Sequence, residues 1–507
     1  MLRFCLIGLL ALCLGCLRVE QPGTEIAENP TEMAELVVDP TFSYQTTEPR
    51  SLTLEVLDPT NEPLAGAYLR IYDLARGGDG TLIFTGQTDA QGRWQREVNL
   101  PPHQDSLLVL VYSVQHSHAY RLFYGSGNST YRLGGDPAQA DPEVQVHAGP
   151  IDARASALAL RWGRPFGESG EAEKGGKVVI CHIPPGNPNN PQTIEVAARA
   201  VPAHLAHGDV LGPCGGSIDS TDTDGDDVLD GFDAYPEDST QSFDEFIPGE
   251  NDFGTVAYED LWPYQGDYDF NDLVVDYNYQ FILNSAGMAV KLKARFTVKA
   301  VGAGMSNGFG FVLSTPASDV ASVTGQRLLD GRVTLAPNGV EAGQSQAVVI
   351  AFDHSHKVLG QPEGRFINTE VDGLQATPDT IEMEVVFANP MDPDALGDAP
   401  FNPFIFTQRG RGHEVHLADQ PPTDLASVAL FGTGNDDSQP SQGRFYKTAS
   451  NLPWAVQVPT PFDYPRERTP IIEAHLKFGE WAQSRGNKSS DWYARKAGYR
   501  AANKIYD

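Results

Sequence analysis

The sequence has few positive charges. It contains 36 Lys and Arg against 67 Asp and Glu in 507 residues, which gives a formal net charge of −31. Such a chain repels nucleic-acid phosphates and anionic lipid head groups, so we expect no nucleic-acid partner and no electrostatic attraction to a membrane. The excess of carboxylates favours divalent cations as partners, although keeping an exported protein soluble explains the bulk charge equally well.

The apolar run at the N-terminus is short. Residues 4–15 follow a single basic residue, Arg3, and are too few to span a bilayer as a mature helix. We therefore expect residues 1–16 to be a signal peptide. Its end, Leu14-Gly15-Cys16, resembles a bacterial lipobox, although Cys13 stands where Leu is usual. The resemblance implies acylation of Cys16 and a lipid-anchored protein of the bacterial envelope, at the outer membrane or cell surface; plain secretion is the alternative.

Cysteine is scarce, with five residues in the whole chain. Cys5 and Cys13 leave with the signal peptide, and Cys16 takes the lipid. Cys181 and Cys214 remain, and an even pair in an exported protein predicts a disulfide.

The usual motifs of enzymes are missing. The sequence has no G-x-S-x-G element, no P-loop and no dinucleotide fingerprint. In "HEVH" the two histidines, His413 and His416, are three residues apart in strand-like sequence, whereas the helical zinc motif needs them four apart. We therefore predict a non-enzymatic protein. A glycan-binding or glycan-cleaving protein that uses calcium structurally is the rival hypothesis, because Glu414 and Asp419 are a possible acid pair.

The 50 glycines and 37 prolines indicate a turn-rich, mainly β chain, and the length requires several domains. Residues 17–50 are acidic and predict a tether. In residues 51–163, "EPLAGA" and "GQTDAQGRW" resemble the carboxypeptidase regulatory-like family, which implies an immunoglobulin-like sandwich. Residues 164–176 predict a linker.

Residues 177–216 form a Cys/His module. The stretches "CHIPPGNP" and "AHLAHGD" resemble a short module of secreted bacterial proteins. A disulfide would close a loop of about thirty residues and add roughly 3–4 kcal/mol of stability. The alternative is a tetrahedral zinc site, whose candidate ligands are Cys181, His182, His204, His207 and Cys214.

Residues 217–243 carry the first acidic cluster. Five aspartates occupy positions 1, 3, 5, 9 and 12 of a calcium loop of the EF-hand type, with a backbone carbonyl at position 7. Alternate residues of a tight loop can turn oxygens toward one hard cation. The segment resembles a thrombospondin type 3 repeat, but Asp227 replaces the usual glycine, and we expect it to adopt positive φ with some strain. The predicted ligands are Asp222, Asp224, Asp226, Val228, Asp230 and Asp233.

A second acidic cluster precedes a strand in "GDYDFNDLVVDY", residues 266–277. Its D-x-D-x-N spacing again predicts calcium, bound where the loop enters the sheet. The alternative is that Asp269 and Asp272 only cap turns. The candidate ligands are Glu259, Asp260, Asp267, Asp269, Asn271 and Asp272.

Residues 244–507 resemble the LruC-type C-terminal domain of bacterial surface lipoproteins. The resemblance rests on "AYEDLWPYQGDYDFNDLVVDY", "FNPFIFTQRGRGHEVHLADQPPTDLA" and "GRFYKTASNLPWAVQVPTPFDYPRE". It implies an exported β-rich domain without an established activity. Alternating residues in 273–281 and 290–298 predict an antiparallel hairpin with a half-buried first strand. We expect a jelly-roll-type sandwich, with helices only in 471–483 and 491–505.

These observations together predict a multi-domain, mainly β, calcium-binding surface lipoprotein. Its role would be adhesion or envelope interaction, through an unknown protein or glycan ligand. An envelope structural protein without a soluble ligand is the third reading.

Overall fold

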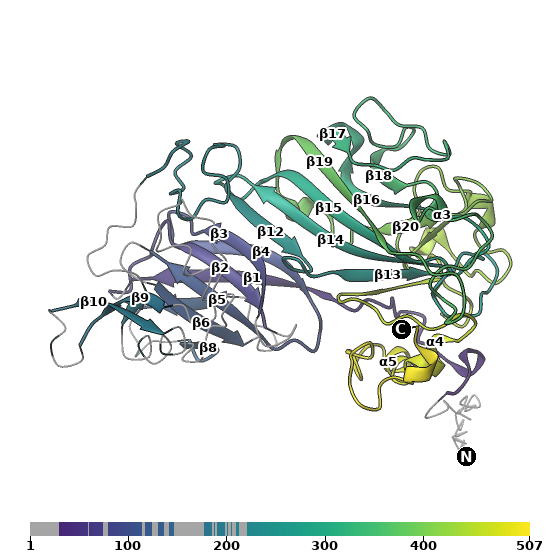
Figure 1. The fold of residues 1–507 in the computed structure, drawn as a ribbon, viewed down its shortest axis with the longest axis horizontal. Helices are drawn as coiled ribbons and strands as arrows, with labels where there is room; N and C mark the ends of the chain where they lie inside the picture. Colours follow the sequence, from purple (N-terminus) through teal and green to yellow (C-terminus); the bar gives the residue numbers. More distant parts are fainter. Residues whose placement is uncertain are drawn as a thin grey trace, which may run out of the picture.

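The computed structural model describes most of the chain that follows the predicted signal peptide (Figure 1). Cys16, the predicted linker 164–176, His207 and Cys214 lie outside the described residues. The described residues are 30–58, 60–74, 80–113, 117–123, 130–135, 141–146, 177–184, 187, 190–197, 200, 204, 209–211 and 221–506.

The chain is mainly β and multi-domain, as predicted, with few and short helices. Among the described residues, no helix combines the length and apolarity needed to cross a bilayer. The α-helices are α3 (Ser355–Val358), α4 (Ile471–Ala474) and α5 (Phe478–Gln483). The 3-10 helices are η1 (Met33–Glu35), η4 (Ala317–Asp319), η5 (Pro393–Leu396), η6 (Val428–Leu430), η7 (Pro440–Gln442) and η8 (Ala502–Lys504).

The N-terminal sandwich packs two sheets around one apolar core, which includes Leu54, Ile71 and Val109. One sheet has the order β4-β1-β7 and the other β3-β2-β5-β6-β8. The first sheet comprises β1 (Glu48–Leu57), β4 (Arg93–Leu100) and β7 (Thr130–Gly134). The second comprises β2 (Tyr68–Asp73), β3 (Thr81–Gln87), β5 (Ser106–Tyr112), β6 (Ser117–Phe123) and β8 (Val144–Val146).

The Cys/His module adds a separate three-stranded sheet of order β10-β9-β11. Figure 1 places β9 and β10 at the end of the molecule opposite α4 and α5. The strands are β9 (Lys177–His182), β10 (Gln192–Ala197) and β11 (Val210–Leu211).

The C-terminal sandwich packs a large sheet against a four-stranded sheet of order β18-β16-β20-β21. Aromatic rings fill the space between them; Phe296 and Phe309, for example, meet edge-on with centroids 5.2 Å apart. The large sheet contains β12 (Phe243–Ile247), β13 (Gly254–Tyr258), β14 (Leu273–Leu283), β15 (Ala289–Ala300), β17 (Val320–Thr324), β19 (Asp379–Met391) and β22 (Ala455–Val458). The facing sheet contains β16 (Gly308–Pro316), β18 (Gln346–Phe352), β20 (Pro403–Phe406) and β21 (Glu414–His416).

The two sandwiches are joined through β12. This strand pairs along its length with β14 and meets β3 of the N-terminal sandwich where Glu245 lies opposite Phe84. One twelve-stranded sheet therefore runs through both sandwiches.

The predicted hairpin forms, with β14 and β15 antiparallel and a turn between Asn284 and Gly287. The prediction that β14 is half-buried is wrong, because nearly all of its residues are buried. Its polar face is covered by other segments: Thr255 donates a hydrogen bond to Asp276 at 2.6 Å, and Asn278 donates to the carbonyl of Gly249 at 2.8 Å. The polar residues that alternate along β14 therefore face polar groups of neighbouring segments and do not face solvent.

Part of the predicted tether is instead integral to the C-terminal domain. Residues 30–47, here called the strap, place Met33, Leu36, Val38, Phe42 and Tyr44 in one core cluster with Trp481 and Phe478. The acidic, Pro-containing composition of the strap suggested a tether. Its apolar residues are spaced too irregularly to show a strand or helix pattern, so the sequence did not reveal that they are buried.

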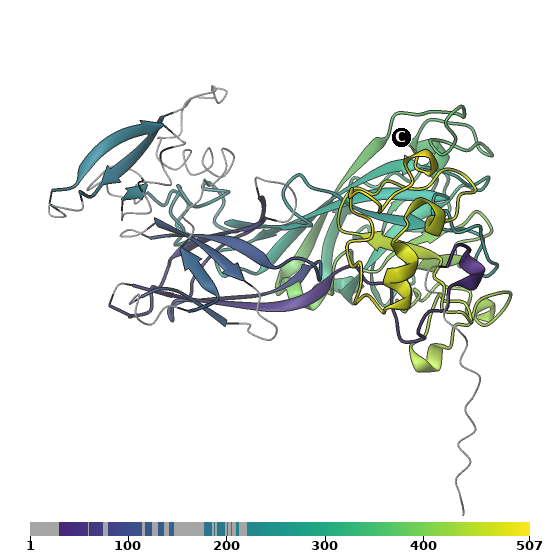
Figure 2. The same cartoon turned by 90° about the horizontal axis from the view of Figure 1, so that it is seen from below.

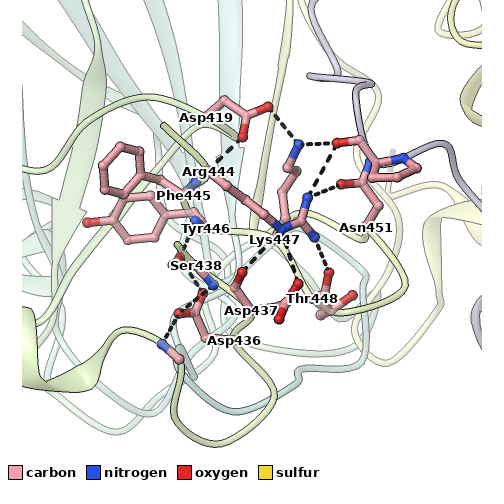
Figure 3. A network of polar contacts seen from close by, with 12 residues as sticks. Asp419, Asp436, Asp437, Ser438, Arg444, Phe445, Tyr446, Lys447, Thr448 and Asn451 are labelled. Carbon is pink, nitrogen blue, oxygen red and sulfur yellow. Dashed lines mark hydrogen bonds and ion pairs between the residues drawn. The ribbon is translucent and has the colours of Figure 1, made fainter. Parts of the chain in front are cut away.

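Polar contacts fix the same strap (Figure 3). Lys447 donates hydrogen bonds to the carbonyls of Pro40 at 3.0 Å and Phe42 at 3.3 Å, and it pairs with Asp419 at 2.6 Å. Asn451 donates to the carbonyls of Asp39 and Phe42. The ammonium group of Lys447 is buried, but carbonyl oxygens and one carboxylate compensate its charge.

Residues 466–506, here called the cap, close the end of the large sheet. The predicted helix 471–483 divides into α4 and α5, because the chain is extended at His475. The predicted helix 491–505 is wrong: these residues form turns and the single 3-10 turn η8. Trp492 is buried against Trp481 and Phe478, so its packing overrides the helical propensity of the segment.

Truncating Phe42 to Ala should destabilise the C-terminal domain by about 3 kcal/mol, because its ring is buried between Tyr44 and Trp481. Val37→Ala, on the exposed side of the same strap, is the matched control and should change stability little. Denaturant unfolding measures both variants. Equal effects would show that the strap is not part of the core.

Candidate calcium centres

The first acidic loop gathers three carboxylates. One oxygen each from Asp222, Asp224 and Asp226 lies within 4.8 Å of the others. Two oxygens that share one calcium ion at about 2.3–2.6 Å lie at most about 5 Å apart, so this spacing suits a common ion. The loop turns as predicted, because Asp227 adopts a φ of +72°. Its N–H donates to Asp222 at 3.1 Å and fixes that carboxylate.

Two carboxylate oxygens of this loop are buried without a hydrogen-bond partner among the described residues: Oδ2 of Asp224 and Oδ2 of Asp233. Burial, and after it the carboxylates of Asp226, Asp224 and Asp230, raise the pKa of Asp233 to about 7, against a hydrogen bond from the Tyr235 N–H. A buried anion among other anions is unfavourable unless a cation joins them.

The other predicted ligands of this loop have different surroundings. Asp230 accepts hydrogen bonds from the backbone and hydroxyl of Thr223, both at 2.7 Å, and so closes the loop. The side chain of Val228 is buried in the large core, which fixes the backbone at position 7.

This loop lies at the joint between the sandwiches. Phe232 stacks on Tyr68 of β2, with centroids 3.8 Å apart and planes 6° apart. The backbone N–H of Leu229 donates to the Tyr68 hydroxyl at 3.1 Å. On the other side, the hydroxyl of Ser242, which precedes β12, donates to Asp226. The loop therefore contacts both sandwiches at once.

The second cluster lies where the chain leaves β13 and enters β14. One carboxylate oxygen each from Glu259, Asp267 and Asp269 lies within 4.8 Å of the others. Glu259 and Asp269 are each only 1% exposed, whereas Asp267 faces solvent. The sequence placed these three together correctly.

Backbone geometry creates this cluster. Tyr268 and Phe270 have φ values of +61° and +50°, which bulky residues rarely adopt, and both side chains are buried. Their packing holds the strained turn. Gly266 leaves the space that Glu259 uses, because a Cβ there would lie 1.7 Å from Oε2 of Glu259.

The electrostatics of the second cluster are more extreme. Burial and the neighbouring Asp267 raise the pKa of Glu259 to about 8. Burial, Glu259 and Asp267 raise the pKa of Asp269 to about 9. Without a cation these two groups are favoured in their protonated, neutral forms, and a bound divalent ion would favour the carboxylates.

The sequence analysis missed a further carboxylate that acts on this cluster, Glu467. Burial and Asp267 raise the pKa of Glu467 to about 7, and the Thr369 hydroxyl donates to it at 3.2 Å. The adjacent backbone N–H of Arg468 donates to Asp269 at 2.7 Å. No local spacing could reveal Glu467, because it reaches the cluster through folding from about 200 residues away along the chain.

Asp260, Asp272 and Asn271 surround a neighbouring polar region outside this three-carboxylate cluster. The backbone N–H of Asp260 donates to Asp272 at 2.7 Å, and the amide of Asn307 donates to Asp260 at 2.9 Å. Burial, and then Asp260 and Glu259, raise the pKa of Asp272 well above its usual range. The Oδ1 atoms of Asn271 and Asn307 are buried without a hydrogen-bond partner among the described residues.

In the Cys/His module, Asp209 joins two of the predicted zinc ligands. The Nδ1 atoms of His182 and His204 both lie 2.7 Å from Oδ2 of Asp209, whose side chain is fully buried. Asp209 was not among the candidates. Cys181 lies on β9, and since Cys214 lies outside the described residues, the disulfide stays a prediction.

The fold and the clusters define a two-sandwich β protein with carboxylate groups at its domain joint and at the entry to its larger sheet. A family model described as "Domain of unknown function (DUF4842)" matches residues 287–493, less than half of the chain. Glu467 lies inside this match, and the other cluster carboxylates precede it. No curated protein sequence matches the chain.

Among solved structures, a "putative lipoprotein from Bacteroides ovatus" shares the fold with a TM-score of 0.50 at 15% identity. The alignment covers 87% of this chain and 99% of that chain. A 9R-lipoxygenase from Cyanothece PCC8801 gives a TM-score of 0.13 at 13% identity, covering 50% of this chain and 40% of that chain, and carries no argument. The two-sandwich architecture is therefore shared with the Bacteroides protein.

The raised pKa values make the stability of the calcium-free protein depend on pH. Glu259 and Asp269 hold protons in the folded state up to about pH 8 and 9, whereas an unfolded chain loses them near pH 4. Stability in chelator should therefore fall as the pH rises from about 5 to about 9, and saturating calcium should flatten that fall.

Denaturant unfolding across this pH range measures the effect. Glu259→Gln should reduce the slope in chelator, and Asp379→Asn on β19, outside both clusters, should keep it. A calcium-free protein that gains stability across this range would contradict the expected burial of these carboxyl groups.

Proposed function

We propose that the protein is a non-enzymatic, calcium-stabilised lipoprotein of the bacterial envelope, anchored through Cys16 and exposed for adhesion or envelope interaction. The observation that carries the calcium assignment is the gathering of three carboxylate oxygens within 4.8 Å of one another at each of two loops, together with the buried Oδ2 of Asp224, which has no hydrogen-bond partner among the described residues. The lipobox-like Leu14-Gly15-Cys16 and the fold shared with the Bacteroides protein support the anchor.

The chain offers these carboxylates little positive charge of its own. Between residues 221 and 290 it has eighteen Asp and Glu and no Lys or Arg. Arg468 acts on Asp267 and Glu467, but its side chain is 71% exposed and its charge is screened by water. A hard divalent cation supplies the missing charge, and carboxylate and carbonyl oxygens are the ligands calcium prefers.

Each proposed ion would hold together segments distant in the sequence. At the first loop, calcium fixes the turn that carries Phe232 against Tyr68 and so locks the N-terminal sandwich to β12. At the second, calcium fixes Glu259 and Asp269, and because Asp269 accepts a hydrogen bond from the Arg468 N–H of the cap, it holds the cap against the large sheet. Calcium at a hundredfold its Kd adds about 2.7 kcal/mol for each site.

Calcium binding should have a stoichiometry of two. Asp224→Asn should abolish the first site and Asp269→Asn the second, leaving one ion in each variant, because both substitutions remove charge while keeping side-chain size. Isothermal titration calorimetry of the chelator-treated protein measures this, with Asp379→Asn as the control that keeps both ions. Absence of binding, together with a Tm unchanged by EGTA, would overturn the proposal.

The first ion should also control the coupling between the sandwiches. Phe232→Ala should separate thermal unfolding into two transitions even with calcium, because it removes the stacking on Tyr68. EGTA should have the same effect on the unmodified protein, and small-angle scattering should then show a larger radius of gyration. Phe445→Ala, which removes a ring that faces Phe431 in the C-terminal sandwich, is the control and should leave one transition. A single transition in Phe232→Ala would contradict the locking role.

A further inference from the structure

The position of the strap determines which part of the folded protein lies nearest to a lipid at Cys16. Its first described residue, Pro30, packs on α5: a Cβ on Gly479 would lie 3.2 Å from the Pro30 ring. Thirteen residues separate Cys16 from Pro30. They span at most roughly 50 Å when fully extended and on the order of 20 Å as a flexible coil. A lipid at Cys16 therefore holds the cap close to the bilayer.

The N-terminal sandwich leaves the strap in the opposite direction. β1 begins at Glu48, directly after the strap, and Figures 1 and 2 show the sandwich and the strands β9 and β10 extending away from α4 and α5. The order of domains from the membrane is thus the reverse of their order in the sequence: the C-terminal cap lies nearest the anchor, and the modules at 48–211 lie farthest from it.

The charged residues also differ between the cap and the rest of the chain. The cap, residues 466–506, has nine Lys and Arg against four Asp and Glu in a chain whose net charge is −31. Several of these basic side chains are exposed: Arg495 is 70% exposed, Lys496 58% and Arg485 59%. Each of these three is paired with an acid, Arg495 with Asp463, Lys496 with Asp491 and Arg485 with Asp39, so the cap is only moderately basic. The acidic segment 221–290 is separate from the cap in the sequence and contacts it at the second cluster, where the Arg468 N–H donates to Asp269.

We propose that the cap is the membrane-facing surface of the anchored protein and rests on the anionic head groups of the bilayer that holds its lipid. An anionic surface attracts the basic cap and repels the acidic remainder, so the molecule is turned with its N-terminal sandwich and Cys/His module outward. Leu476, which is 50% exposed, gives this surface an apolar contact. The inference rests on the proposed lipid anchor, and it assigns the ligand-presenting surface to the far modules.

The test measures the depth of two labels. Asn487→Cys on the cap and Gln192→Cys on β10 are each labelled with a fluorophore in the lipidated full-length protein, and the protein is reconstituted in phosphatidylcholine vesicles with phosphatidylglycerol. A nitroxide carried on lipid head groups should quench the label at 487 several-fold more than the label at 192. Equal quenching, or stronger quenching at 192, would overturn the proposal.

Charge reversal tests the electrostatic part. Lys488→Glu combined with Arg495→Glu should reduce the difference between the two labels, as should high salt or omission of phosphatidylglycerol. Arg93→Glu on β4, half exposed in the N-terminal sandwich, is the control and should leave the difference unchanged. Circular dichroism verifies folding of each variant. A difference insensitive to all three changes would show that anionic head groups do not orient the protein.

A second set of measurements tests the membrane-facing role of the cap separately from the acylation of Cys16. Mass spectrometry of the N-terminal peptide reports whether Cys16 is acylated. In parallel, residues 17–507 with a hexahistidine tag in place of Cys16 are held on vesicles that contain nickel-chelating lipid and phosphatidylglycerol. Strong quenching at 487 in this arm supports the surface even when Cys16 is unmodified, and its absence overturns the surface even when Cys16 is acylated.

Discussion

The structure depends on carboxylates that the chain does not neutralise. In residues 221–290 acidic side chains occur without one Lys or Arg, yet Glu259 and Asp269 are almost fully buried. Ionised in that environment they repel one another, and the guanidinium group of Arg468, which acts on the neighbouring Asp267 and Glu467, is 71% exposed and screened by water. Protonation or a bound cation must resolve this. The proposed divalent ion would do so for both clusters and would join distant segments as well.

Contacts between segments distant in the sequence connect the domains. The strap and the cap interlock through Phe42, Tyr44 and Trp481, so residues from the two ends of the described chain share one core. β12 continues the large sheet into the N-terminal sandwich, and the first acidic loop crosses the same joint. If the proposed anchor holds the protein at a membrane, its far modules would be presented on a connected, mainly β body.

Sequence patterns over a few residues predicted the features that depend on neighbouring residues. The hairpin of β14 and β15 follows from alternation, and the positive φ of Asp227 follows from the calcium-loop resemblance. The spacing of Asp267 and Asp269 agrees with their approach in the structure, whereas Asn271 of the same spacing lies outside the cluster. Contacts over long sequence distances escaped prediction. Glu467 joins its cluster through folding alone, and the strap is ordered by a core some 400 residues away along the chain. Trp492 packs inward and so prevents the helix that its neighbours favour.

The most direct test of the account is a crystal structure of the protein grown with calcium, with anomalous scattering recorded to locate the ions. The account predicts one peak among Asp222, Asp224 and Asp226 and another among Glu259, Asp267 and Asp269, each with oxygens at about 2.3–2.6 Å. Carboxylates turned apart into solvent, with no anomalous density between them in saturating calcium, would contradict it.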